Sequence, residues 1–180
     1  MRNETDSQPK PRRAKIDQHL FRRTMGAFAS GVTVITVDAG ASTHAMTANA
    51  FMSGSLEPPL CVVSIAKRAH THKMIRQSGR FGVNILSADQ QDLALFFAGK
   101  KSLDVDAQFQ RVGEVPLLRD CAARIAAHVD SQCDCGDHTL FIGAIVFMDS
   151  NDRPPLIYHR SAFGALAAKM GERVPAPEFW

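Results

Sequence analysis

The 180-residue chain is poor in aromatic residues and has no long apolar run, and each shortage excludes a class of function. No stretch approaches the ~18 consecutive apolar residues that a membrane-spanning helix needs, so no membrane association is expected. Besides 11 Phe there are only one Tyr and one Trp, and no basic stripe is interleaved with aromatic residues. Grooves that bind nucleic acid combine these two features. The net charge of +3 therefore favours small anionic nucleotides as partners over nucleic acid.

Cysteine is also scarce, and the four thiols do not form a metal-binding pattern. Cys133 and Cys135 stand one residue apart, but no second pair follows at the spacing of a structural zinc site. Residues 1–15 hold charges and prolines instead of the apolar core of a signal peptide. We therefore expect a cytoplasmic protein with reduced thiols and no bound metal.

Three motifs of nucleotide binding and nucleophilic catalysis are missing. The chain contains neither G-x-G-x-x-G nor G-x-x-x-x-G-K-[ST], so a Rossmann dinucleotide site and a P-loop lose support. It also lacks the G-x-S-x-G turn that would present a serine nucleophile, which argues against a hydrolase of that type. If the protein binds nucleotides, it must do so on a different fold.

Length and composition favour a single domain. With 45% hydrophobic residues, 180 residues can bury one core but not two. We expect a disordered basic leader over residues 1–15, one folded domain over residues 16–168 and a C-terminal tail over residues 169–180. The chain shows no internal repeat.

The hydrophobic pattern predicts a mainly β domain with flanking α-helices. A first helix is expected from the N-cap Asp17 to Gly31, where a glycine can end it. Residues 99–116 are polar and are expected to form a loop. Six or more strands joined by turns favour a closed antiparallel barrel over a doubly wound sheet. The expected strands are 32–37, 45–51, 60–66, 81–86, 122–129, 138–148 and 156–158, and two further helices follow residues 67–73 and span 89–98.

The first two expected strands alternate small hydroxyl residues with apolar ones. The runs are Val-Thr-Val-Ile-Thr-Val over residues 32–37 and Thr-His-Ala-Met-Thr-Ala over residues 43–48. Because successive side chains of a strand point to opposite faces, one face can enter the core while the other offers hydroxyl groups to a flat ligand. Thr is also a good strand former that needs no ligand. The pattern therefore fits both a shelf for a cofactor and an ordinary half-buried strand pair.

Several short motifs occur in an order that resembles the short-chain flavin reductase family, the reductase components of two-component flavin-dependent monooxygenases. The resemblance covers residues 18–166, nearly the whole expected domain. The motifs are Thr47-Ala48-Asn49-Ala50-Phe51, Leu56-Glu57-Pro58-Pro59-Leu60, the apolar run 61–65, Phe81-Gly82-Val83-Asn84-Ile85-Leu86, Gly136-Asp137-His138 and Pro155-Leu156-Ile157-Tyr158.

This resemblance implies a closed antiparallel FMN-binding split β-barrel that pairs as a homodimer. It implies an NAD(P)H:flavin oxidoreductase, in which hydride passes from reduced nicotinamide to flavin and the reduced flavin leaves for a separate monooxygenase. FMN and FAD both remain open as the flavin, whether substrate or bound group, and NADH and NADPH as the donor. The chain is too short to hold an aromatic-substrate oxygenase site as well, so oxygen chemistry is expected on the partner.

The resemblance also assigns flavin-binding residues. Residues 64–71 follow an expected strand and begin a helix, so backbone N–H groups, the helix dipole, Lys67 and Arg68 favour phosphate there. Without the surrounding motifs, a solvated charged turn would explain both cations equally well. Tyr158 and Phe163 are expected to line the pocket near the chain end, although packing explains them about as well. The cofactor-binding set is Met46, Thr47, Ala48, Asn49, Ser53, Ser55, Ser64, Ile65, Ala66, Lys67, Arg68, Thr71, Phe81, Asn84 and Tyr158.

His138 is the residue that the resemblance places near the nicotinamide, and it is the one catalytic residue expected. Hydride transfer is direct, so His138 need not act as an acid or a base; it can position the nicotinamide ring or stabilise charge. A histidine that begins a strand is otherwise more often a surface or capping residue.

Two other flavoprotein classes fit the same barrel. A flavin-binding electron carrier would bind flavin without oxidising nicotinamide, and a pyridoxal-phosphate oxidase would oxidise pyridoxamine phosphate. Nothing in residues 44–71 specifically favours the oxidase. Oxidation of NADH or NADPH that depends on added flavin separates the reductase from both alternatives.

Overall fold

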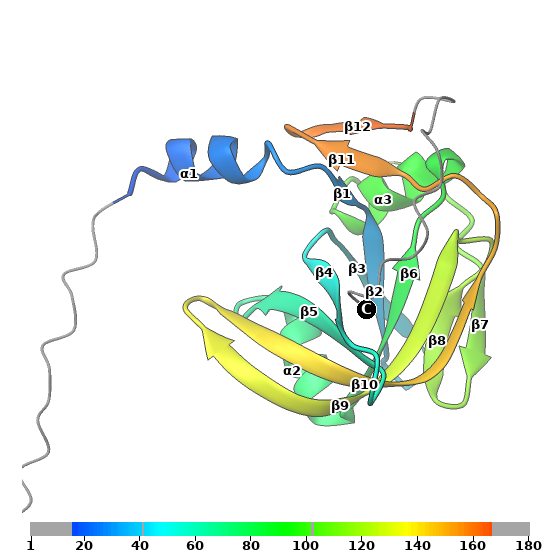
Figure 1. The fold of residues 1–180 in the computed structure, drawn as a ribbon. Coiled ribbons are helices and arrows are strands. Elements are labelled where there is room, and N and C mark those ends of the chain that lie inside the picture. Colours follow the sequence, from blue (N-terminus) through cyan, green and yellow to red (C-terminus); the bar gives the residue numbers. More distant parts are fainter. Residues whose placement is uncertain (1–15, 41, 102, 167–180) are drawn as a thin grey trace, which may run out of the picture.

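The computed structural model describes residues 16–40, 42–101 and 103–166, so the expected leader and the expected tail lie outside the described residues. Within these residues the structure has twelve strands and three α-helices, whose arrangement Figure 1 shows. The helices are α1 (Gln18–Met25), α2 (His70–Ser78) and α3 (Gln91–Phe97), with a short 3-10 turn η1 (Ala88–Gln90) before α3. The strands are β1 (Ser30–Gly31), β2 (Thr33–Asp38), β3 (Thr43–Ala48), β4 (Phe51–Ser55), β5 (Leu60–Ala66), β6 (Arg80–Ile85), β7 (Phe109–Val112), β8 (Val115–Leu118), β9 (Ala123–Cys135), β10 (His138–Ser150), β11 (Ile157–His159) and β12 (Ala162–Gly164).

Seven antiparallel strands form the main sheet, in the order β3-β2-β6-β9-β10-β5-β4. Two smaller sheets, β1-β11-β12 and β7-β8, flank it. The long hairpin β9–β10 lies in the middle and joins β6 on one side to β5 on the other. The domain is therefore mainly β with few helices, as the sequence predicts.

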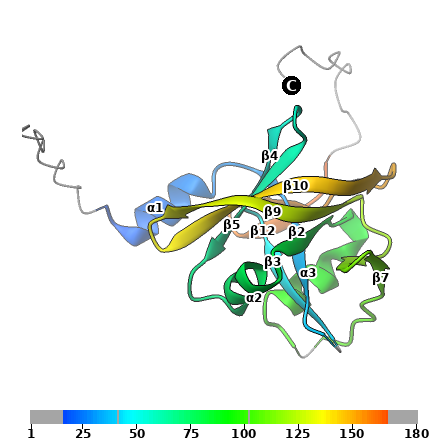
Figure 2. The ribbon, with the colours of Figure 1, turned by 90° about the horizontal axis from the view of Figure 1, so that it is seen from below.

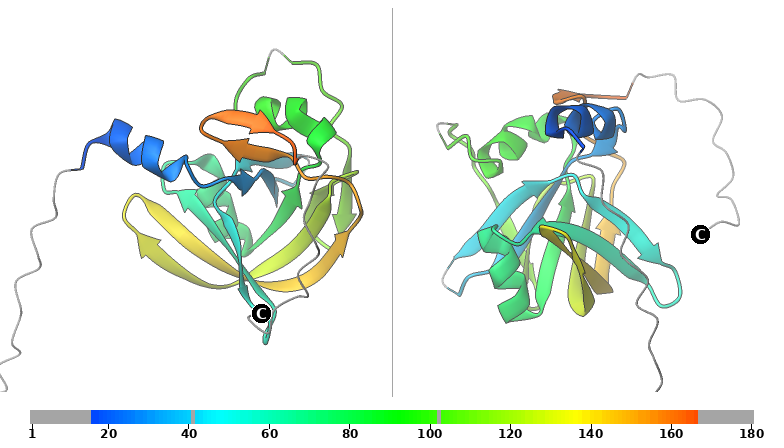
Figure 3. Two further views of the ribbon diagram at one scale, coloured as in Figure 1. Left: turned by 45° about the horizontal axis from the view of Figure 1, so that its top comes forward. Right: turned by 90° about the vertical axis from the view of Figure 1, so that its left-hand side faces the viewer.

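The expected closed barrel is found only in part. Among the described residues β3 and β4 are the two edges of the main sheet, with no ladder between them. They are nevertheless consecutive in the chain, joined by residues 49 and 50, and the Ser64 N–H donates to the Ala50 carbonyl across 3.0 Å. The coiled sheet in Figure 3 thus brings its edges together at one end.

Strand β2 is buried on both faces, so of the two interpretations of its hydroxyl pattern the structure supports an ordinary core strand here. Val34, Ile35 and Val37 enter the core, while Thr33 and Thr36 are buried as well. Each Thr hydroxyl donates to a protein carbonyl, from Thr33 to Ala48 and from Thr36 to Pro116. A buried hydroxyl group must find a partner, and here both partners are protein atoms. The hydroxyl groups of β2 are therefore not offered to a ligand.

Several element boundaries differ from those expected. The first helix has its N-cap at Asp17, as predicted, but it ends at Gly26 and not at Gly31. The expected strand 45–51 is two strands, because the chain bends at residues 49–50 and continues as β4. Part of the expected loop 99–116 pairs as the β7–β8 hairpin. These differences concern short or polar segments, in which hydrophobic periodicity is weak.

Helix α1 lies apart from α2 and α3, on the side of the β9–β10 hairpin (Figure 2). None of its residues is buried, and its apolar residues Leu20, Phe21 and Met25 are exposed. Its polypeptide continues into β1, which pairs with β11. No helix among the described residues is long and apolar enough to span a membrane.

Candidate functional site

A first hollow, here called the β3 hollow, brings together expected residues from opposite ends of the chain. It measures about 330 Å³ and lies where the end of β3 faces α3 and the β11–β12 hairpin. Apolar and aromatic side chains line it together with a few polar groups, a composition typical of small-molecule sites. Its lining is Val32, Thr47, Ala48, Asn49, Leu95, Ala98, Tyr158, Ser161 and Phe163.

Thr47 holds two walls of the β3 hollow together. Its hydroxyl donates to the Ala94 carbonyl of α3 across 2.7 Å. On the other side Tyr158 packs against Phe163, with ring centroids 5.5 Å apart. Asn49 follows the last residue of β3 and is exposed, so its amide is accessible. The hollow thus offers a polar edge from Asn49 against a partly aromatic wall.

Ser30 is a residue of this region that no sequence motif indicated. Its hydroxyl is buried and has no hydrogen-bond partner among the described residues. Ser30 pairs directly with Tyr158 across β1 and β11, so both side chains lie on the same face of that small sheet. A buried polar atom without a partner is costly. Its position beside Tyr158 suits a site that a polar ligand completes.

A second hollow, here called the β10 hollow, lies at the tip of the β9–β10 hairpin and measures about 700 Å³. It brings together three expected residues, Ser64 of β5, Arg68 before α2 and His138 of β10. Helix α1 forms its other wall. The full lining is Ile16, Gln18, Phe21, Arg22, Ser64, Arg68, Cys135, Asp137 and His138.

His138 is oriented by its neighbour Asp137. The His138 Nδ1 and the Asp137 Oδ1 lie 2.8 Å apart, and the imidazole is 42% exposed. The hydrogen bond from His138, together with its charge, holds the pKa of the Asp137 carboxyl below its usual range. An ionised Asp137 accepts from Nδ1–H, which leaves Nε2 available to a ligand in the β10 hollow.

The turn before α2 has the features expected of an anion site. Its N-cap residue, Ala69, provides no side-chain cap, and unpaired N–H groups at a helix start favour anions. Lys67 forms an ion pair with Asp134 across 3.1 Å, and its backbone N–H donates to the Asp137 carbonyl across 2.9 Å. The Lys67 charge is therefore partly compensated, and Arg68 is the expected cation that lines the hollow itself.

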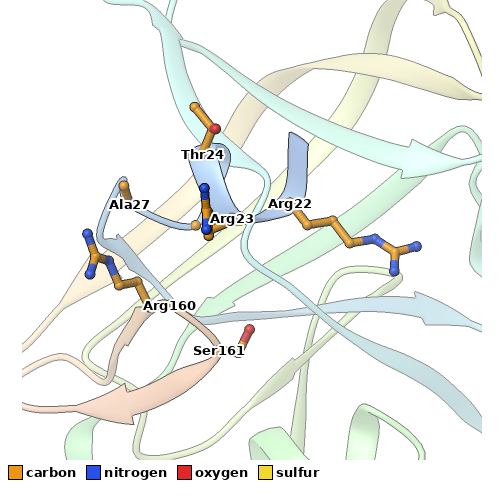
Figure 4. A pocket seen from close by; sticks show the side chains of 7 residues that line it. Arg22, Arg23, Thr24, Ala27, Arg160 and Ser161 are labelled. Atoms are coloured by element: carbon orange, nitrogen blue, oxygen red, sulfur yellow. The ribbon is translucent and has the colours of Figure 1, made fainter. Parts of the chain in front are cut away.

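Arg22 is a second cation of the β10 hollow, and the sequence pattern did not single it out as a ligand. It lies in the last turn of α1, exposed like the rest of that helix. Arg22 also lines a third hollow with Arg23, Arg160 and Ser161, shown in Figure 4. The only sign in the sequence that Arg22 could bind a ligand is its positive charge near the start of the predicted domain. Exposed arginines are common in proteins, so this sign is not specific.

Several expected residues lie away from both hollows. Phe81 and Ile65 are fully buried in the core. The Asn84 side chain is also buried; it donates to the Val34 carbonyl and accepts from the Leu118 N–H. These three side chains support the fold in this structure and contact neither hollow. Their expected role as flavin neighbours therefore has no supporting contact.

Thr71 and Met46 form an interior contact that joins α2 to β3. The buried Thr71 hydroxyl lies 2.9 Å from the His44 Nε2 and 3.5 Å from the Met46 Sδ. Thr71 is thus already occupied, which weakens its expected role at phosphate. Ala66 ends β5 next to Lys67, whereas Ser53 and Ser55 lie on the edge strand β4; none of the three lines the two hollows.

The two hollows together suit an elongated ligand that has an aromatic part and an anionic part. The β3 hollow can accept a flat ring, since it has an aromatic wall and the Asn49 amide. The β10 hollow can accept phosphate and a second ring, since Arg68, Arg22 and His138 face it. The residues present therefore fit a flavin and a nicotinamide nucleotide.

Comparison with known proteins shows which family the chain belongs to. A sequence model of the flavin reductase like domain matches residues 25–167. An NADH-dependent flavin reductase of Rhodococcus sp. is 40% identical over 151 residues, covering 82% of this chain and 85% of that protein. The reductase component of a 4-nitrophenol 4-monooxygenase/4-nitrocatechol 2-monooxygenase of Rhodococcus opacus is 32% identical over 152 residues, covering 83% of this chain and 81% of that protein. The solved structure of the flavin reductase PheA2 in its native state superposes with a TM-score of 0.82 at 44% identity, covering 84% of this chain and 99% of that chain.

Proposed function

Because the chain belongs to the flavin reductase like domain family, we propose that it is an NADH:flavin oxidoreductase that supplies reduced flavin to a separate monooxygenase. The observation that carries this proposal is the β10 hollow, where Ser64, Arg68 and His138 of three distant segments meet in a chain that matches the family from residue 25 to residue 167. The reaction transfers a hydride from the nicotinamide to the flavin ring.

The residues of the chain have binding and orienting tasks in this reaction. Arg68 binds phosphate as a planar cation, an interaction that is stronger than a neutral hydrogen bond. His138, held by Asp137, positions the nicotinamide ring without transferring a proton. Asn49 and the aromatic pair Tyr158 and Phe163 hold the flavin ring in the β3 hollow.

NADH is the donor that we assign, because several relatives are named as NADH-dependent reductases. Relatives named as FMN reductases and as an FAD reductase both occur, so either flavin fits the family. A relative that is the reductase component of a nitrophenol monooxygenase supports a separate oxygenase as the acceptor of reduced flavin. A cytoplasmic location follows from dependence on NADH, which cytoplasmic metabolism supplies.

We further propose that the coiled sheet functions as a split barrel and that two chains pair as a homodimer. Family membership supports the barrel, as does the bond from Ser64 to Ala50 that brings β4 near the end of β3. Exposed apolar side chains support the dimer, since α1, β4 and β10 each carry some. The division into residues 1–15, 16–168 and 169–180 remains our proposal for the domain boundaries.

Steady-state oxidation of NADH with added FMN or FAD tests the reductase function. We expect turnover that depends on flavin and saturates with NADH. Absence of flavin-dependent turnover with NADH and with NADPH, combined with tight flavin binding, would instead establish a flavin-binding electron carrier. Mass spectrometry of the denatured protein shows which flavin, if any, copurifies.

A further inference from the structure

The third hollow, here called the arginine hollow, has a cationic lining in which Arg23 and Arg160 have no role in the reductase site described above. It measures about 720 Å³ and is lined by Arg22, Arg23, Thr24, Gly26, Ala27, Arg160 and Ser161. Three guanidinium groups and two hydroxyl groups line it, and no carboxylate does. Among the described residues none of the three arginines forms an ion pair.

The hollow is built from two segments that are held together by a backbone bond. The Arg160 N–H donates to the Gly26 carbonyl across 2.9 Å, which fixes the β11–β12 turn against the end of α1. A Cβ atom at Gly26 would lie 3.0 Å from the Arg22 carbonyl oxygen, so the close approach suits glycine. In Figure 4 Arg23 and Arg160 flank the junction, Ser161 lies below it, and Arg22 extends toward the opposite side.

The backbone of the turn is strained at the two residues that line the hollow. Arg160 and Ser161 have φ values of 47° and 65°, the left-handed region that two-residue hairpin turns require and that Asn-Gly satisfies with least strain. An Arg-Ser pair in this conformation is uncommon, and strained residues concentrate at ligand sites. Hairpin geometry alone does not explain the guanidinium group of Arg160 and the hydroxyl group of Ser161 at these positions.

The arginine hollow also lies between the two parts of the proposed reductase site. It shares Ser161 with the β3 hollow and Arg22 with the β10 hollow. A ligand that occupies either of those hollows with its ring can therefore extend its anionic part toward Arg23 and Arg160.

We propose that Arg23, Arg160 and Ser161 bind the diphosphate of NADH, because the phosphate next to the flavin ring is assigned to Arg68 in the β10 hollow. Guanidinium groups bind phosphate oxygens through paired hydrogen bonds, and several of them suit a group with more than one negative charge. NADH and FAD both contain an adenosine diphosphate, whereas FMN carries a single phosphate and no adenosine. This inference rests on the proposed reductase function for the identity of the nucleotide, but the anion site itself does not depend on turnover.

Calorimetric titration of the full chain with ADP tests the site directly. We expect Arg23→Gln and Arg160→Gln each to weaken ADP binding about tenfold or more, the loss of one charge-assisted interaction. Arg119→Gln is the matched control, because Arg119 is exposed but lines a different hollow that contains Asp120 and Asp149. This control should bind ADP like the unaltered chain. Equal thermal unfolding of all four proteins verifies that the substitutions leave the fold intact.

Three further titrations, with NADH, FAD and FMN, identify which dinucleotide uses the site. NADH affinity should fall about tenfold or more in Arg160→Gln, while FMN and FAD affinities should stay within twofold. A loss of FAD affinity with unchanged NADH affinity would overturn the assignment to NADH. Absence of ADP binding to the unaltered chain, or equal ADP affinity in Arg160→Gln and the control, overturns the proposal. If the unaltered chain oxidises no NADH but Arg160→Gln still loses ADP binding, the reductase function fails and the anion site stands.

Discussion

Arg68 and His138 line the same hollow, yet their replacement should have different effects. Arg68→Ala removes a phosphate partner, so flavin binding should weaken by about 1–3 kcal/mol while turnover at saturating flavin is largely retained. His138→Ala should leave flavin affinity unchanged and slow hydride transfer, because misplacing the donor affects the reaction more than cofactor binding. Flavin titration and stopped-flow absorbance measure the two effects. Identical profiles, or a His138→Ala variant that chiefly loses flavin, would contradict the assignment of separate phosphate and nicotinamide sites.

Most of the expected residues that line the two hollows stand at or near the ends of elements, and Ser64 and Tyr158 are exceptions inside strands. Thr47, Asn49, Arg68 and His138 stand at or just beyond strand ends or before a helix, where chain geometry leaves side chains accessible. Asn84 belongs to the middle of β6, and its partners Val34 and Leu118 come from distant strands. A polar residue inside a strand carries no local sign of whether a ligand or the protein satisfies it, so its burial could not be predicted.

The four cysteines should fall into two reactivity classes. Burial raises the pKa of the Cys61 thiol to about 11 and that of the Cys121 thiol to about 12, so thiolate is scarce at these positions near neutral pH. Cys133 and Cys135 are exposed on β9. Because the thiolate is the reacting form, a thiol reagent should label Cys133 and Cys135 rapidly and the other two only on unfolding. Mass spectrometry of the labelled peptides tests this, and early labelling of Cys61 would contradict it.

At the scale of elements, the packing of Phe81 from β6 and Ala127 from β9 against β10 depends on a glycine. A Cβ atom at Gly143 would lie 2.6 Å from the Phe81 Cζ and 2.8 Å from the Ala127 Cβ, and both neighbours are fully buried. Gly143→Ala should therefore lower the free energy of unfolding by about 1–3 kcal/mol, the usual effect of overpacking. Gly164→Ala is the control, since a Cβ there meets nothing within 4 Å. Urea unfolding measures both, and equal stability of the two variants would refute the packing argument.

Helix α2 is coupled to β10 through a buried histidine that makes stability depend on pH. The His72 Nε2 lies 2.9 Å from the Thr139 Oγ1, and burial, reinforced by the cations Arg76 and Lys67, lowers the pKa of His72 below 6.5. Below that pH the unfolded chain binds a proton that the folded chain excludes, so stability falls as the pH drops through this window. Between about pH 7.5 and 5.5 the free energy of unfolding should decrease less in His72→Gln than in the unaltered chain. An equal decrease in both proteins would show that His72 is not responsible.

The long apolar elements were predictable from the sequence, and the short ones were not. Strands β2, β5, β6 and β10 follow from continuous or alternating apolar runs. The strands β7, β8 and β12 have only four, four and three residues. Gly113 and Pro116 also interrupt the β7–β8 segment, and proline is unusual inside a strand. The pairing of these strands depends on neighbours that are distant in the sequence, such as Leu117 packing with Ala126, and local patterns do not encode such neighbours.

For the whole molecule, the exposed apolar side chains predict self-association. Phe28 after α1 is 78% exposed and Met148 on β10 is 67% exposed, and both are large. We expect analytical ultracentrifugation to show a species of twice the 19.7 kDa chain mass. Phe28→Glu or Met148→Glu should shift it toward the monomer, because a charge buried in an interface is costly, whereas Lys73→Glu on the exposed side of α2 should not. A chain that sediments as a monomer at micromolar concentration would rule out the dimer.

The position of the β9–β10 hairpin has a consequence for how the chain is made. Without residues 123–150 the main sheet would separate into β3-β2-β6 and β5-β4, because only the hairpin pairs with both β6 and β5. A ribosome produces all five of those strands before it produces the hairpin, so from residue 85 until the hairpin is made the emerging polypeptide carries two sheet fragments with unpaired edges. Such edges are prone to aggregation. Folding of the main sheet therefore has to wait until the β9–β10 hairpin has been translated. Until then the nascent chain needs protection against aggregation.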